Sequence, residues 1–264
     1  MVLFLQTVDY DIPKWQTTNG IIGKSPGLGL RPGQPKDLID SSLIVFNYQS
    51  ETDENNIPGW KGWAERTTAF LEEYKNATAQ NLGKQCEGAG EAGKADKEHG
   101  CKFPLSELGA CGKGNFGYDA GTPCIFLKLN RIYGLNNEPY EEPTSEMPNA
   151  LKERIKKQPN KKQVWVNCEP KYPADREMLK NVKYFPASGG FPDKYFPYQN
   201  QEDYLNPLVA VQFHPKLPKA SGFMLHIECR AWAQNIGYNR RDKVGIASLE
   251  VRVLDNKAAE SSNK

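Results

Sequence analysis

Three histidines are the side chains best suited to acid–base chemistry or metal binding, and they are His99, His214 and His226. We place His99 in a loop and His214 in a turn. His226 and Glu228 fall on the outward face of a predicted strand, where we expect surface ion pairing. The sequence contains no HExxH, no GxSxG and no His/Cys spacing typical of a metal site. It therefore predicts no catalytic residue, no metal site and no cofactor.

A glycine-rich segment offers the one apparent phosphate-binding motif. Residues 88–93 match GxGxxG, and residues 88–94 match most of a phosphate-binding loop. Ala95 stands where the motif needs Ser or Thr, and no predicted strand precedes the loop. Without a strand-to-helix transition, no helix N-terminus is aligned to hold a phosphate. We considered a nucleotide-binding enzyme for this reason, and we favour a surface loop.

The cysteines indicate disulfides rather than metal binding. No CxxC pair occurs, and an even number of cysteines without metal spacing favours three disulfides in an oxidising compartment. Sequence alone leaves their connectivity open, and free thiols in a cytosolic protein are the alternative. The six are Cys86, Cys101, Cys111, Cys124, Cys168 and Cys229.

Composition excludes several classes of protein. The 264 residues are 38% hydrophobic and include 19 prolines and 23 glycines, which predicts a modest core with many turns. The net charge is +2, so there is no electrostatic reason to expect a nucleic-acid partner. No run of residues has the length of a membrane span, and no signal peptide is recognisable. An exported domain of this kind needs an anchor, which we expect to precede residue 1.

Two short runs that end in cysteine organise the predicted fold. Residues 164–168 and 225–229 alternate in polarity, which is typical of strands half-buried against a core. Cys168 and Cys229 take matching inward positions, so a disulfide could join the two strands. The chain-entropy model gives such a link, across about 60 residues, roughly 4 kcal/mol.

Further strands and one helix complete the predicted domain. Strands are expected at 41–46, 124–130, 204–213 and 248–253, and the helix at 60–80. Apolar residues at helical spacing form its buried stripe: Trp63, Thr67, Phe70, Leu71 and Tyr74. Asn76 begins an N-glycosylation sequon and lies about 200° around the helix from Tyr74. We expect a glycan there.

The remaining segments are predicted to be loops. Residues 136–163 form a polar connection. Residues 184–192 and 195–198 alternate aromatic residues with proline, either as a satellite cluster under the core or as a docking surface.

Residues 1–40 form an extended arm, residues 41–256 the domain and residues 257–264 a polar tail. Strands separated by turns, with one helix, predict an antiparallel β-sandwich with long loops and a flanking helix.

Several motifs in a fixed order resemble one known family. They are residues 5–9, 13–16 and 25–32, the cysteine-framed segment 101–111, then 116–118, 123–124, 128–132, 204–213, 227–229 and 235–238. With them, the chain looks like the extracellular domain of the β subunit of the sodium pump (Na,K-ATPase) and its H,K-ATPase relatives. Its overall sequence most resembles those of the invertebrate members of this family.

The resemblance implies a structure and a role. The fold would be an immunoglobulin-like sandwich with the disulfides Cys86–Cys101, Cys111–Cys124 and Cys168–Cys229. The chain would be a non-catalytic subunit on the extracellular face of the plasma membrane, held by a type II anchor. It would escort the catalytic α subunit through folding to the membrane and modulate K+ affinity.

The resemblance also implies where the α subunit binds. A family aromatic loop corresponds to Tyr195, Phe196, Pro197 and Tyr198, although Phe196, Gln199 and Asn200 depart from the family pattern. The α contact would further include Gln6 and Tyr10. The alternative is an immunoglobulin-like adhesion or secreted module without a pump partner, and pairing with other β subunits in adhesion is compatible with both.

Overall fold

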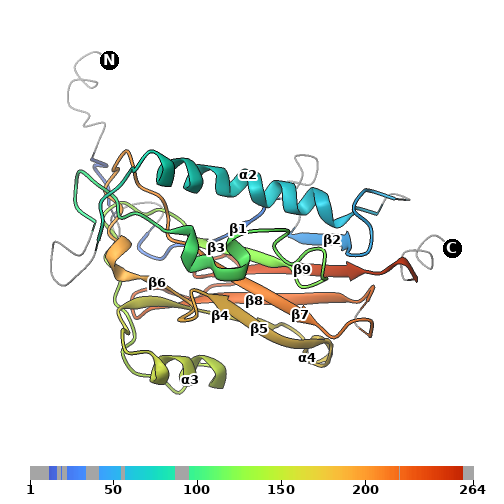
Figure 1. Ribbon diagram of the computed structural model, residues 1–264. Coiled ribbons are helices and arrows are strands. Elements are labelled where there is room, and N and C mark those ends of the chain that lie inside the picture. Colours follow the sequence, from blue (N-terminus) through green and yellow to red (C-terminus); the bar gives the residue numbers. More distant parts are fainter. Residues whose placement is uncertain are drawn as a thin grey trace, which may run out of the picture.

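Two β-sheets face each other in the computed structural model, which describes residues 12–16, 19, 23–33, 42–54, 57–86, 95–219 and 221–257 (Figure 1). Sheet A has the order β1 (Leu28–Arg31), β3 (Cys124–Leu129), β7 (Val209–Pro215) and β5 (Leu179–Phe185). Sheet B has the order β2 (Leu43–Asn47), β9 (Ile246–Leu254), β8 (Met224–Trp232), β4 (Gln163–Pro170) and β6 (Gly190–Pro192). The predicted fold class, a mainly β sandwich, is confirmed.

The core lies between the sheets. In β8 and β9 burial alternates along the strand, so Ile227 and Val251 are fully buried while their neighbours face outward. In the antiparallel β4–β8 ladder, Cys168 lies directly opposite Cys229. All three disulfides implied by the resemblance are present, namely Cys86–Cys101, Cys111–Cys124 and Cys168–Cys229.

Helices cover the outer faces of both sheets. Helix α2 (Trp60–Ala79) lies over sheet A, where the Phe70 ring is 5.9 Å from that of Phe126 (Figure 1). Helix α3 (Asn149–Lys157) lies on sheet B, where Leu151 belongs to a second apolar cluster with Trp165 and Trp232. Phe126 and Trp165 are therefore buried on the outward faces of β3 and β4. The expectation that β4 is half-buried is wrong, because α3 lies against its other face.

Several predicted boundaries need correction. Strand β1 lies within the expected arm and pairs with β3. Strand β7 begins at Val209, after the expected start at 204, and it contains His214, which was expected in a turn. Residues 184–192, expected to be a loop, contain the end of β5 and all of β6.

Helices and one strand pairing also differ from the prediction. Helix α3 occupies part of the expected polar connection. Helix α4 (Pro173–Met178) and the 3-10 helices η4 (Leu105–Gly112) and η5 (Asp193–Tyr195) were not predicted. The sandwich is not wholly antiparallel, since β2 pairs with β9 in parallel. Among the described helices, none is long and apolar enough to cross a membrane.

Candidate functional site

The aromatic loop singled out in the sequence is folded into one end of the sandwich. Tyr195 ends η5 and is fully buried, with its ring 5.8 Å from that of Phe103. Phe103 in turn lies 5.9 Å from Tyr74 of α2. The Tyr195 hydroxyl is buried without a hydrogen-bond partner, and burial raises the pKa of this phenol. Tyr195 is thus a core residue here, and its ring is not available to a partner's surface.

The rest of the loop packs against the core and leaves Pro197 and Tyr198 partly accessible to solvent, and we call these two residues the ledge. Phe196 is buried, whereas Pro197 and Tyr198 are half-buried. The Tyr198 ring lies 4.9 Å from that of Tyr204, and the Arg131 guanidinium stands 5.2 Å from each. The core-cluster interpretation is therefore confirmed for the first half of the loop. The second half is partly accessible to solvent, and a docking role for it stays a prediction.

Hydrogen bonds tie residues 204–206, which follow this loop in the chain, to α2, to β3 and to Arg131 just after β3. Tyr74 of α2 donates from its hydroxyl to the Asn206 carbonyl at 2.9 Å, and the Asn206 amide donates to the Leu129 carbonyl of β3 at 2.8 Å. Arg131 Nη2 donates to the Tyr204 carbonyl at 2.9 Å. A surface held in this way is ordered before any partner arrives, which lowers the entropy cost of association.

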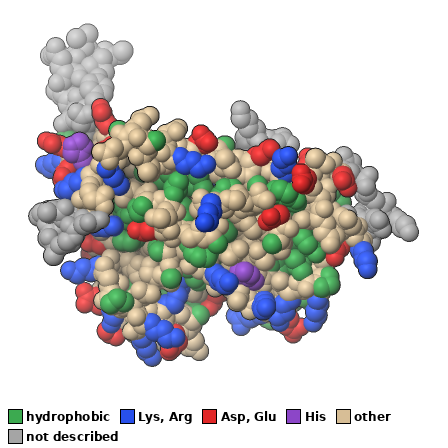
Figure 2. Space-filling view, viewed as in Figure 1, with side chains coloured by type: hydrophobic (Ala, Val, Ile, Leu, Met, Phe, Trp, Pro, Cys, Tyr) green, Lys and Arg blue, Asp and Glu red, His purple; other side chains and the backbone are tan. Residues whose placement is uncertain are grey.

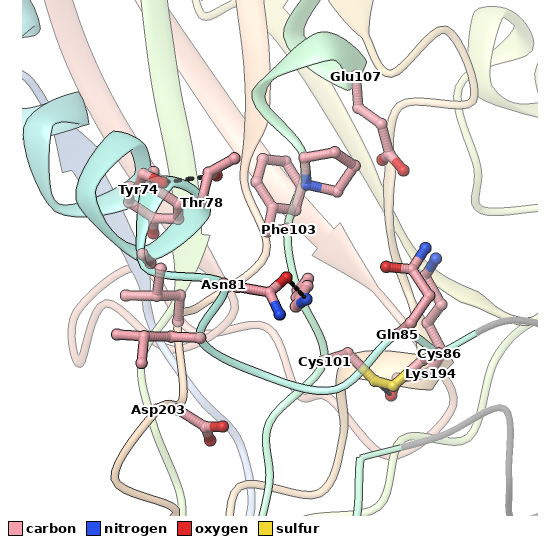
Figure 3. Close-up of a pocket in the computed structure, with 15 residues that line it drawn as sticks. Tyr74, Thr78, Asn81, Gln85, Cys86, Cys101, Phe103, Glu107, Lys194 and Asp203 are labelled. Carbon is pink, nitrogen blue, oxygen red and sulfur yellow. Dashed lines mark hydrogen bonds between the residues drawn. A yellow bond between two sulfur atoms is a disulfide. The ribbon is translucent and has the colours of Figure 1, made fainter.

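A pocket of about 340 Å3 opens between the end of α2, the Cys86–Cys101 disulfide and residues on either side of this loop, among them Lys194 and Asp203 (Figure 3). Its polar lining includes Glu107, Lys194 and Asp203. Burial raises the pKa of Glu107, and the Lys194 charge opposes that shift. The pocket mixes an apolar wall with a few polar groups, which is a lining suited to binding a ligand or side chain.

Exposed apolar residues lie near the same loop. The Gly134 amide donates to the Tyr198 carbonyl at 2.8 Å, and the Gln16 side chain lies beside Gly134. Next to Gln16, Trp15 is 67% exposed, the largest value among the exposed apolar residues of the described chain. We did not single out Trp15 from the sequence, because nothing in an irregular arm reveals whether a tryptophan is buried.

Of the other site residues predicted from the sequence, some lie within the described structure and some lie outside it. Asn76 is exposed on α2, opposite the buried stripe, and Thr78 of its sequon donates to the Tyr74 carbonyl at 2.8 Å. The geometry that the sequence predicted for Asn76 is present, and glycosylation itself stays a prediction. Gln6, Tyr10 and the glycine-rich segment 88–94 lie outside the described residues.

The histidines do not assemble a catalytic arrangement. His99 lies 3.1 Å from Asp203, and His226 lies 3.4 Å from the buried Asp175. The surface ion pairing expected here is confirmed for Glu228, whose partner is Arg240 at 2.8 Å. Within the described ranges, no cluster of three or more His, Cys, Asp or Glu side chains could hold a metal ion. What the site offers is a shaped, ordered surface.

Comparison with known proteins identifies relatives along nearly the whole chain. The family model described as the sodium/potassium ATPase beta chain matches residues 1–249. Sodium/potassium-transporting ATPase subunit beta-2 of Drosophila melanogaster is 38% identical over 263 residues, covering 96% of this chain and 78% of the relative. Subunit beta-1 of the same species is 38% identical over 252 residues, covering 94% and 77%. A probable subunit beta-3 of Caenorhabditis briggsae is 31% identical, covering 97% and 74%.

Proposed function

Because this chain belongs to the sodium/potassium ATPase beta-chain family, we propose that it is a non-catalytic β subunit that escorts the α subunit of a cation pump. The family match over residues 1–249 carries the proposal. In this role the subunit promotes folding and assembly of the α subunit, accompanies it to the plasma membrane and modulates K+ affinity. Its domain lies on the extracellular face, where an oxidising compartment suits three disulfides.

Mass action explains how a domain without its own chemistry can serve a pump. A partner that binds the folded α subunit and not the unfolded one stabilises it by an amount that grows with concentration and affinity. The ledge formed by Pro197 and Tyr198, together with exposed Trp15, supplies aromatic anchors of the kind that dominate protein interfaces. We place the α contact at this end of the sandwich.

The test co-expresses the β subunit with a pump α subunit. We expect the two to co-purify and the α subunit to reach the cell surface in larger amounts than without the β subunit. Trp15→Ala should reduce co-purification. Tyr172→Ala is the matched control, since Tyr172 is also exposed, at 45%, but lies at the start of α4.

Two outcomes would contradict this proposal. The first is α delivery that does not depend on the subunit. The second is stable self-association of the chain without any α subunit and no complex with one, which would favour the adhesion module instead.

A further inference from the structure

A second pocket, of about 280 Å3, lies on the outer face of sheet B, near α4 and the start of α3. Its floor is formed by β4 and β8, and its lining includes residues of α4 and of the segment after β8. We call it the Arg230 pocket, after the residue at its centre. The residues that matter below are Glu146, Glu169, Arg176, Arg230, Trp232 and Tyr238.

Arg230 is held between two aromatic rings. Its guanidinium carbon lies 3.6 Å from the Trp232 ring centroid and 4.4 Å from that of Tyr238. Rings this close pack against the guanidinium plane, and stacking leaves the N–H donors at the edge of that plane. In the described part of the chain, no carboxylate comes within ion-pairing distance of Arg230.

The stack is braced by a separate ion pair. Arg240 contacts both oxygens of Glu228, with Nε to Oε2 at 2.8 Å and Nη2 to Oε1 at 3.2 Å. The Tyr238 hydroxyl donates to Glu228 Oε1 at 3.0 Å. Glu228 thus fixes the Tyr238 ring over Arg230, and its own oxygens are already engaged. A planar guanidinium held against two rings is preorganised for an anion that arrives in its plane.

Two donors at the floor of the pocket lack acceptors. Arg230 Nε and Trp232 Nε1 are both buried without a hydrogen-bond partner, while the two terminal nitrogens of Arg230 are not among the buried unpaired atoms. A buried donor without an acceptor carries a desolvation cost, which an acceptor entering nearby relieves. Burial also lowers the pKa of Arg230, and a guanidinium stays charged in any case. A guanidinium charge without a carboxylate partner favours a ligand that brings a negatively charged acceptor.

The other walls narrow the chemistry of the ligand. Arg176 adds a second positive charge at the rim, and Glu146 and Glu169 add carboxylate acceptors. We propose that the Arg230 pocket binds an acidic sugar unit. Its ring carboxylate meets the edge of Arg230, and its hydroxyls donate to Glu146 and Glu169. The volume suits one sugar ring, and the exposed part of Tyr238, which is 40% exposed, offers the ring an apolar face. This inference does not depend on the proposed pump partner.

Saturation-transfer NMR with three small probes tests the ligand class on the folded, disulfide-bonded chain. Glucuronate combines a carboxylate with a sugar ring, glucose lacks the carboxylate and acetate lacks the ring. We expect glucuronate to bind at least about tenfold more tightly than glucose, the loss typical of one charge-assisted contact. Acetate should also bind more weakly than glucuronate. Equal binding of glucose, or of acetate, overturns the proposal.

Variants locate the binding to this pocket. Arg230→Gln should weaken glucuronate binding about tenfold or more, and Arg230→Lys should also weaken it, because an ammonium cannot form the planar two-donor contact. Arg241→Gln is the matched control, an exposed cation next to Arg240 that does not line the pocket. Should an Arg230 variant unfold, exposed Arg176→Gln gives the same test at the rim with at least a few-fold loss. Retained binding in folded Arg230→Gln or in Arg176→Gln contradicts the site.

A final measurement distinguishes the source of the ligand. The same affinity is measured for free glucuronate and for an oligosaccharide that ends in glucuronate. Tighter binding of the oligosaccharide indicates the end of a glycan, and tighter binding of the free acid indicates a small metabolite. Failure of both to bind overturns the proposal.

Discussion

At the scale of single residues, two buried tyrosines in the aromatic cluster have opposite hydrogen-bond status. Tyr74 donates to the Asn206 carbonyl at 2.9 Å, whereas the Tyr195 hydroxyl has no partner. Tyr74→Phe leaves a buried carbonyl short of a donor and should cost about 1–3 kcal/mol of unfolding free energy. Tyr195→Phe removes an unpartnered buried hydroxyl and should be neutral or stabilising. Urea unfolding with disulfides intact measures both, and a cost for Tyr195→Phe equal to that of Tyr74→Phe would contradict the structure.

Glu107 gives a prediction for pH dependence at the same scale. Burial raises its pKa above the ordinary value of 4.5, so the folded state holds its proton more tightly than the unfolded state does. The stabilising contribution of Glu107 is therefore full below about pH 4.5 and is lost as the pH rises through the raised pKa. Glu107→Gln should gain stability relative to the unaltered chain as the pH rises above about 4.5. Melting curves that stay parallel across this range would show that Glu107 is not buried as described.

At the scale of elements, the spacing of apolar residues predicted the type and orientation of a helix or strand correctly wherever only one of its faces meets the core. Helix α2, β8 and β9 have the predicted type and orientation because one face of each packs against the core and the opposite face is more exposed to solvent. The half-buried prediction for β4 is wrong because Trp165 on its outward face is buried under α3. Helix α3 escaped notice, since only Leu151 and Ile155 along it are apolar and buried. A helix that covers a small second core needs few apolar residues, and its signal is correspondingly weak.

The second core makes α3 testable. Leu151→Ala should destabilise the fold by about 2–5 kcal/mol, because it opens a cavity among fully buried side chains. Lys157→Ala, on the exposed end of the same helix, is the control and should change stability by less than about 0.5 kcal/mol. Chemical denaturation of both variants gives the comparison. A cost for Leu151→Ala no larger than that of the control would mean that α3 is not docked on sheet B.

At the scale of the whole molecule, the sequence predicts the class of fold better than the details of its assembly. Alternation along 248–253 identifies a strand but carries no information on its neighbour, so the parallel pairing of β2 with β9 could not be derived. Strand β1 was missed because the four residues of its run, Leu-Gly-Leu-Arg, sit among prolines and glycines. The candidate site shows the same limit: the aromatic loop was recognised, but the burial of Tyr195 depends on Phe103 and α2, which reach it from distant parts of the chain.

The three disulfides allow a prediction about how the whole fold is stabilised. A link restricts the unfolded chain more when it closes a longer loop, and the sequence separations are 61 residues for Cys168–Cys229, 15 for Cys86–Cys101 and 13 for Cys111–Cys124. The chain-entropy model gives about 4 kcal/mol for the first and about 3 for each of the others. Replacing both cysteines of one pair by serine should therefore cost about 1 kcal/mol more at Cys168–Cys229 than at either short loop. Urea unfolding of the three double variants measures the order, and the two short-loop variants serve as each other's control. A reversed order would show that the link between β4 and β8 acts mainly on the native state, so that its contribution comes from local packing instead of from restricting the unfolded chain.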